Sequence, residues 1–215
     1  MTWYRVRVDL LETTPAIWRE LLVPADLSLP EFSTVLQAAM GWENSHLHSF
    51  ARTAESHWQS RPRWAMDVPG EPLEGPHELP ERDATVATLL GTPGDQATYL
   101  YDFGDDWEHL LTLGEILDSG ASAVVDLASP VLTQGEGVCP PEDSGGVGGY
   151  DQILESVAAL ERGERLEEWP EQVVMWAFDT LDTAQIRAAL TFDLAAQQSQ
   201  VAAAGAPRPP LHPNL

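Results

Sequence analysis

Hydrophobic and polar positions alternate at the start of the chain, which is the period of a half-buried β-strand. In the segment 4–10, Tyr4 begins a face of apolar residues, while Arg5, Arg7 and Asp9 fall on the other face. A second alternating segment, 17–23, carries apolar groups on both faces and therefore favours an interior position in a sheet. The two segments predict a β-hairpin.

Helical spacing replaces this alternation after residue 27. Ser28 and Glu31 have the spacing of a capping box, and apolar residues then recur at helical intervals until Gly41. The sequence therefore predicts a capped helix directly after the first hairpin. A further strand is expected at 46–52, with His46 and His48 on one face.

The rest of the chain alternates between loops rich in proline or glycine and short regular elements. Irregular loops are expected at 66–84 and 126–149, and a short helix at 85–90. Two strands, 98–103 and 106–113, should close a hairpin over Gly104-Asp105. Helical patterns follow at 151–162, 169–178 and 183–197.

Strands lead and helices trail, so the predicted fold class is α+β. We expect an antiparallel or mixed sheet, the capped helix after the first hairpin, and helices clustered toward the C-terminus. The length of 215 residues suffices for one domain without disulfide or metal support, and we assign it to residues 1–198. The segment 199–215, rich in Ala and Pro and without periodicity, is expected to be a disordered tail.

Charge narrows the possible partners. The chain has 34 acidic and 11 basic residues and a formal net charge of −23, which disfavours binding to nucleic acid phosphates. It contains no long apolar run and no secretory signal pattern, and its single cysteine cannot form an internal disulfide. The expected location is the cytoplasm, without a membrane partner. A small molecule, a cation or a protein segment remains as candidate partner, and the oligomeric state stays open.

Candidate chemistry is concentrated in two polar segments, Tyr99–His109 and Cys139–Tyr150. Glycine, proline and acidic residues in loops are typical of binding sites. The predicted ligand-binding residues are Trp42, Asp102, Asp105, Asp106, Trp107, His109, Glu142 and Asp143.

The hairpin suggests one specific pair. If Gly104-Asp105 forms a two-residue turn, Asp102 and His109 become diagonal neighbours on one face of the sheet. A carboxylate bonded to an imidazole is typical of a general base or of a metal-binding histidine. A purely structural hydrogen bond between the two side chains is the alternative. The corresponding catalytic set would be Asp102, His109 and Glu142.

Histidines also suggest a metal site. His46 and His48 could chelate a divalent metal with His109, or with Glu142 and Asp143, since imidazoles and carboxylates suit zinc, iron or manganese. Histidines that merely pack in the sheet are the alternative, because neither C-x-x-C nor H-E-x-x-H occurs. No cofactor follows from the sequence beyond this possible metal. Cys139 is expected to be a small buried apolar residue.

Four separated motifs suggest a family: P-A-I-W-R at 15–19, G-W-E-N-S-H-L-H at 41–48, Y-D-F-G-D-D-W-E-H at 101–109 and P-P-E-D-S-G-G at 140–146. Over about residues 3–195 the chain resembles the plasmid pRiA4b open-reading-frame-three-like family. The resemblance implies a small α+β fold of bacteria and archaea, found on plasmids and beside insertion sequences, and implies no activity. Ser144 stands where the family usually has cysteine, which removes a thiol partner for Cys139. Phe178-Asp179-Thr180 departs from the family's F-D-P segment.

The leading functional hypothesis is a non-catalytic binding or interaction module. Its pocket would lie between the 101–109 hairpin and the 139–150 loop. A metal-assisted hydrolase that uses His and Asp or Glu residues is the alternative. An accessory protein of a mobile genetic element is a third hypothesis, and it rests on the family resemblance alone.

Overall fold

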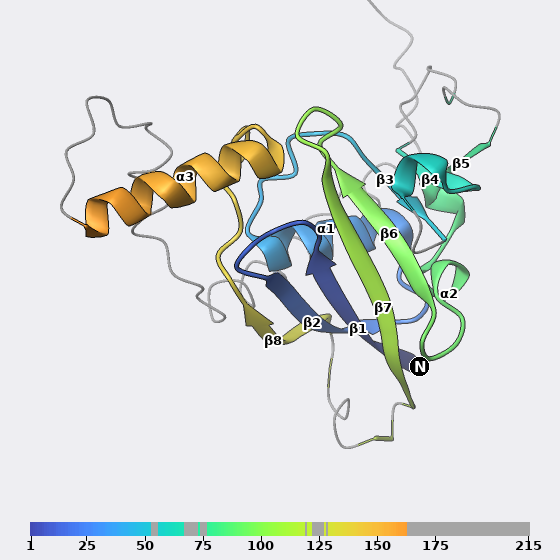
Figure 1. Ribbon diagram of the computed structural model, residues 1–215. Coiled ribbons are helices and arrows are strands. Elements are labelled where there is room, and N and C mark those ends of the chain that lie inside the picture. The colour runs from blue at the N-terminus through green and yellow to red at the C-terminus, as the bar shows by residue number, and fades with distance from the viewer. Residues whose placement is uncertain are drawn as a thin grey trace, which may run out of the picture.

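The computed structural model describes residues 1–52, 56–66, 73, 77–118, 120–121, 127 and 129–162. The predicted helices at 169–178 and 183–197, the boundary at 198 and the tail 199–215 lie outside these residues. Figure 1 shows a twisted sheet with one long helix against its face and a second long helix that projects from its edge. No helix in the described part combines the length and apolar character that crossing a membrane requires.

Among the described residues, eight strands form a single mixed sheet in the order β5-β4-β3-β6-β7-β1-β2-β8. Of the strand pairs in the described part of the chain, β4 and β5 alone run parallel. The strands are β1 (Thr2–Leu10), β2 (Ile17–Pro24), β3 (His48–Ala51), β4 (Arg63–Ala65), β5 (Glu78–Pro80), β6 (Gln96–Tyr101), β7 (Trp107–Asp118) and β8 (Val131–Glu136). The helices are α1 (Leu29–Met40), α2 (Val86–Leu89) and α3 (Gly146–Glu161), with 3₁₀ turns η1 (His57–Gln59) and η2 (Glu81–Asp83).

The first elements of the structure confirm the predictions made from the sequence pattern. β1 and β2 form the predicted antiparallel hairpin, and β2 lies in the interior between β1 and β8. The capping box of Ser28 and Glu31 starts α1, and Gly41 ends it in the left-handed conformation with φ 93°. α2 confirms the short predicted helix, with Thr85 as its N-cap.

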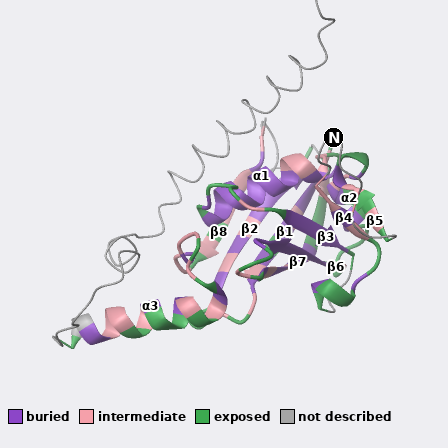
Figure 2. Cartoon of the chain, turned by 90° about the horizontal axis from the view of Figure 1, so that it is seen from above, coloured by how far each residue is buried: buried purple, intermediate pink, exposed green. Residues whose placement is uncertain are grey.

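The core lies between α1 and the sheet, as the two views show (Figures 1 and 2). Phe32 of α1 stacks on Phe50 of β3 with ring centroids 5.9 Å apart. Ser33 and Gln37, one helical turn apart, both hydrogen-bond the hydroxyl of Tyr99 on β6 at 2.9 and 2.8 Å. The buried helix face and the central strands are therefore joined by apolar packing and by a satisfied polar contact.

Two predicted loops contain regular structure, and those predictions were wrong. The 66–84 segment holds β5 and η2, and the 126–149 segment holds β8. Both strands lie at the edges of the sheet, where a neighbouring strand supplies hydrogen bonds that local sequence preference does not reveal. Helices do not cluster toward the C-terminus in the described part, because α1 and α2 both precede β6. α3 begins five residues earlier than the predicted start at Asp151.

The β6–β7 connection also differs from prediction. Tyr101 pairs with Trp107 and Tyr99 pairs with His109, so the loop spans five residues, 102–106. Asp102 and Asp106 begin and end this loop with φ values of 55° and 60°. The predicted two-residue turn over Gly104-Asp105 is wrong, because Asp102 and Asp106 both leave the strands in a left-handed conformation that side chains other than glycine adopt less often. Likewise, the strand predicted at 46–52 begins only at His48.

Candidate functional site

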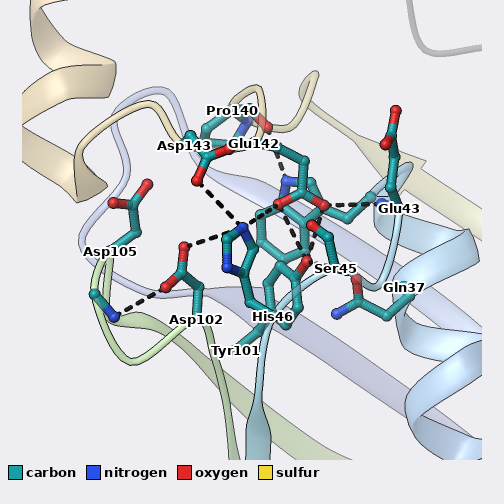
Figure 3. A network of polar contacts seen from close by, with 12 residues as sticks. Gln37, Glu43, Ser45, His46, Tyr101, Asp102, Asp105, Pro140, Glu142 and Asp143 are labelled. Carbon is teal, nitrogen blue, oxygen red and sulfur yellow. Dashed lines mark hydrogen bonds and ion pairs between the residues drawn. The ribbon is translucent and has the colours of Figure 1, made fainter.

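Three loops meet where the ends of α1, β6 and the segment before α3 come together (Figure 3). The loop 41–47 follows α1, the loop 102–106 joins β6 to β7, and the loop 140–145 leads into α3. The backbone amide of Asp102 donates to Leu47 O at 3.0 Å, directly beyond the pair His48 and Tyr101 that ends the β3–β6 ladder. His46 lies just beyond it, outside the strand ladder, and turns toward the loop 140–145.

His46 lies among three carboxylates. Its Nε2 is 3.2 Å from Asp143 Oδ1, 3.7 Å from Asp102 Oδ2 and 3.8 Å from Glu142 Oε2. This nitrogen is buried, yet among the described residues no hydrogen-bond partner is correctly placed for it. In the described residues, one group of potential metal ligands has all its ligand atoms within 4.8 Å of one another, namely His46, Asp102 and Asp143.

Asp102 is held in place by its own loop. Its Oδ1 accepts a hydrogen bond from the amide of Gly104 at 2.9 Å, which leaves Oδ2 directed at His46. Asp143 shares the left-handed backbone conformation, with φ 54°. Such conformations are uncommon outside glycine and are enriched for aspartate. Both carboxylates are thus presented from tight turns, from two different segments of the chain.

Glu142 is fixed by neighbours of its own. The hydroxyl of Tyr101 donates to it at 2.9 Å, and the amide of Glu43 donates to the same oxygen at 2.8 Å. Burial raises the pKa of Tyr101 to about 12, so the phenol stays a hydrogen-bond donor at neutral pH. The amide of Ser45 in turn donates to the Tyr101 oxygen at 3.1 Å. Glu142 is therefore anchored beside the His46 group.

Trp42 packs beneath these polar residues. Its Nε1 donates to Pro140 O at 2.8 Å, and its ring stacks on Tyr101 with centroids 5.0 Å apart. Trp107 lies on the same cluster, with its ring centroid 6.0 Å from that of Trp42. Both indoles are buried, so they support the loops rather than offering an exposed contact.

Asp105 joins the hairpin to the loop before α3. Its Oδ2 accepts from the amide of Gly145 at 2.9 Å. A Cβ on Gly146 would meet Asp105 O at 2.5 Å, so only glycine allows this close approach. The two segments predicted to face each other therefore do lie in contact. The carboxylate of Asp105 thus accepts from a backbone amide directly before the start of α3.

The structure does not bring the predicted histidine set together. His48 Nε2 lies 2.8 Å from Glu81 Oε2, with both side chains buried, and His48 is not part of the group around His46. His109 faces the core, where its ring contacts Trp42 and Tyr99 and its Nδ1 lies 3.2 Å from Tyr99 O. Burial lowers the pKa of His109 to about 4.

The predicted pair of Asp102 with His109 was therefore wrong. The five-residue loop places His109 opposite Tyr99, and Asp102 falls beyond the end of the ladder. The structure does not bring together the metal set of His46, His48 and His109, because His48 lies against Glu81 and His109 faces the core. The core position of His109 also separates it from Asp102 and Glu142 of the catalytic set. Asp106 also points elsewhere, since its Oδ1 accepts from Trp58 Nε1 at 2.9 Å.

Two residues at the site were missed by sequence reasoning. Tyr101 and Ser45 position Glu142, and both belong to the motifs that contain the predicted site residues. Strand alternation places Tyr101 on the same face of β6 as Tyr99, and local sequence carries no signal that its hydroxyl reaches a loop 41 residues away in the chain. Cys139 is buried as predicted, and burial raises its pKa to about 11.

Comparisons with known proteins find a family model, a related sequence and a similar crystal structure. The family model of the plasmid pRiA4b ORF-3-like protein matches residues 2–187. The uncharacterized protein y4hQ of Sinorhizobium fredii is 34% identical over 167 residues, which is 77% of this chain and 79% of the relative. The crystal structure of MM3350, a protein of unknown function from Methanosarcina mazei Go1, matches with a TM-score of 0.64 and 29% identity, over 85% of this chain and 92% of that one. This chain belongs to the plasmid pRiA4b ORF-3-like protein family.

Proposed function

We propose that this protein is a binding module for a divalent metal cation, with His46, Asp102 and Asp143 as ligands. The observation that carries the proposal is the convergence of one imidazole and two carboxylates from three loops, with ligand atoms within 4.8 Å. One imidazole and two carboxylates form a donor set that suits zinc, manganese or iron. We therefore propose a cation as the ligand of the pocket predicted between the hairpin and the 139–150 loop.

Electrostatics supports the same proposal. The ligand oxygens of Asp102 and Asp143 lie within 4.8 Å of each other, with Glu142 on the same His46 nitrogen, and like charges at such a separation repel one another. A divalent cation offsets this repulsion and also gives the buried His46 Nε2 a partner. Glu142 already accepts hydrogen bonds from Tyr101 and Glu43. We therefore propose that it adds negative charge around the ion without coordinating the ion directly.

The first test is titration of metal-free protein with zinc and with manganese by calorimetry, with metal content measured by mass spectrometry. We expect about one ion per chain. Asp143→Asn and His46→Gln should each weaken binding by about tenfold or more, because each removes a ligand. Asp143 has a side chain that is 75% exposed, so its replacement should leave the fold intact.

Glu43→Gln is the matched control. It removes a nearby acid that contributes only its backbone amide to the site, so metal affinity should stay within about twofold of the original protein. Failure of the original protein to bind either metal would refute the proposal. Equal weakening by all three variants would assign the binding to overall charge instead. Location in the cytoplasm and a role on mobile elements remain predictions.

A further inference from the structure

An exposed aromatic pair includes Phe103 of the same β6–β7 loop that carries Asp102. Trp58 of η1 and Phe103 of the loop contact each other edge to face, with ring centroids 5.4 Å apart. They remain 42% and 41% exposed, respectively. Large aromatic rings that stay exposed while contacting each other are typical of interaction surfaces.

Trp58 is held in position by two contacts to its ring and one to its backbone. Its Nε1 donates to Asp106 Oδ1 at 2.9 Å, and the Arg63 guanidinium lies 5.4 Å from the ring centroid. Arg61 donates to the Trp58 carbonyl oxygen at 2.9 Å. A ring fixed before binding loses little conformational entropy when a partner arrives. Trp58 is therefore suited to serve as an anchor.

Acidic groups flank this pair. Glu108 accepts from the amide of His57 at 2.9 Å, directly beside Trp58. Burial raises the pKa of Glu108, and the charges of Asp106 and Glu12 raise it further, so both of these carboxylates lie near enough to act on Glu108. Arg63 does not neutralise them, because its guanidinium is paired with Glu78 at 2.6 Å. Arg61 also lies here and donates to the carbonyl oxygens of Trp58 and Ser60, so among the described residues the three carboxylates outnumber the one arginine that is not paired with Glu78.

We propose that this surface, formed by Trp58, Phe103, Asp106, Glu108 and Glu12, docks a basic segment of a partner protein. An arginine or lysine side chain would lie against the exposed aromatic rings, which attract cations, while its charge pairs with the carboxylates. The aromatic rings would bury apolar surface against the partner, and the carboxylates would attract its positive charges. The proposal is independent of the cation site.

The test uses fluorescence anisotropy of a labelled peptide in which arginine alternates with glycine, measured with chelator-treated full-length protein. A peptide with glutamate in place of arginine is the charge control. Trp58→Ala and Phe103→Ala should each weaken binding by about tenfold, as expected for interface anchors. Leu79→Ala and Ile116→Ala remove apolar side chains of similar exposure, 43% and 42%, and should have little effect.

A second pair of variants separates local from overall charge. Asp106→Asn keeps an oxygen that can accept from Trp58 Nε1, yet removes the charge at the surface, so it should weaken binding by about threefold to tenfold. Asp118→Asn removes the same charge at the far end of β7 and should leave binding unchanged. Equal losses in both variants, or unchanged binding in Phe103→Ala, would overturn the proposal. Stronger binding of a single-stranded oligonucleotide than of the arginine peptide would assign the surface to nucleic acid instead.

Discussion

Arg19 carries a full charge into the interior, with only 1% of its surface exposed. Its guanidinium donates to Ala39 O at the end of α1 at 2.7 Å and to Glu136 O of β8 at 2.9 Å. The last carbonyl groups of a helix lack partners within the helix, and a positive charge there is favoured by the helix dipole. One side chain therefore joins the end of α1 to two strands.

Replacing Arg19 with methionine should lower the free energy of unfolding by about 3 kcal/mol, because buried carbonyl oxygens lose their donors. Urea denaturation followed by tryptophan fluorescence measures the change. Arg7→Met is the control, since the Arg7 side chain is 45% exposed and lies over Trp18 on the open face of the sheet. Its replacement should cost less than about 1 kcal/mol. Similar losses in both variants would show that burial of Arg19 contributes nothing of its own.

At the scale of elements, the loop before α3 decides whether Glu142 and Asp143 reach the site. Gly149 lies in the first turn of α3, and its amide donates to Gly145 O at 3.2 Å. A Cβ on Gly149 would collide with the carbonyl oxygen of Ser144, whereas a Cβ on Gly148 would meet open space. The two neighbouring glycines therefore differ sharply in what they tolerate.

Gly149→Ala should displace the loop 140–145 and weaken zinc or manganese binding by about tenfold, because the ligands of a metal must be held in place. Hydrogen exchange in that loop should become faster at the same time. Gly148→Ala should leave both quantities unchanged and stabilise α3 by up to about 1 kcal/mol, since alanine favours helix. Faster exchange with unchanged metal affinity would place the cation elsewhere, and no change in either quantity would contradict the collision with Ser144.

For the whole molecule, buried histidines make stability depend on pH. Burial lowers the pKa of His57 to about 3, with Arg63 and Arg61 adding to the effect, and lowers that of His109 to about 4. A histidine in the unfolded chain has a pKa near 6.5. Below that pH, His57 and His109 bind protons in the unfolded chain but stay neutral in the folded protein. Stability is therefore lost as the pH falls from about 6.5 toward 4.

Each of these histidines should contribute about 1.4 kcal/mol of lost stability per pH unit between about pH 6 and 5. The measurement is the free energy of unfolding in urea across that range. His57→Gln and His109→Gln should each reduce the slope of the unfolding free energy against pH, relative to the original protein, by the amount that one proton contributes. This holds whatever the stability of each variant at pH 7. The comparison with the original protein cancels the carboxylates that titrate in the same range. Slopes unchanged in both variants would mean that these histidines do accept protons in the folded protein.

The sequence by itself determined the elements whose signals are local. Alternation defined β1 and β2, and the Ser28 capping box with Gly41 defined α1, because strand period and helix caps are set by neighbouring residues. The motifs around 41–48, 101–109 and 140–146 also pointed to the residues that meet at the site. These features need no knowledge of distant contacts.

Only the tertiary structure decided which of those residues meet. Edge strands β5 and β8 depend on hydrogen bonds from partners far away in sequence, so local proline and glycine content suggested loops there. The left-handed aspartates lengthened the β6–β7 loop, which sent His109 to the core and left Asp102 beside His46. A shift of the register by a few residues changes which side chains face one another, and that register is fixed by packing over the whole sheet.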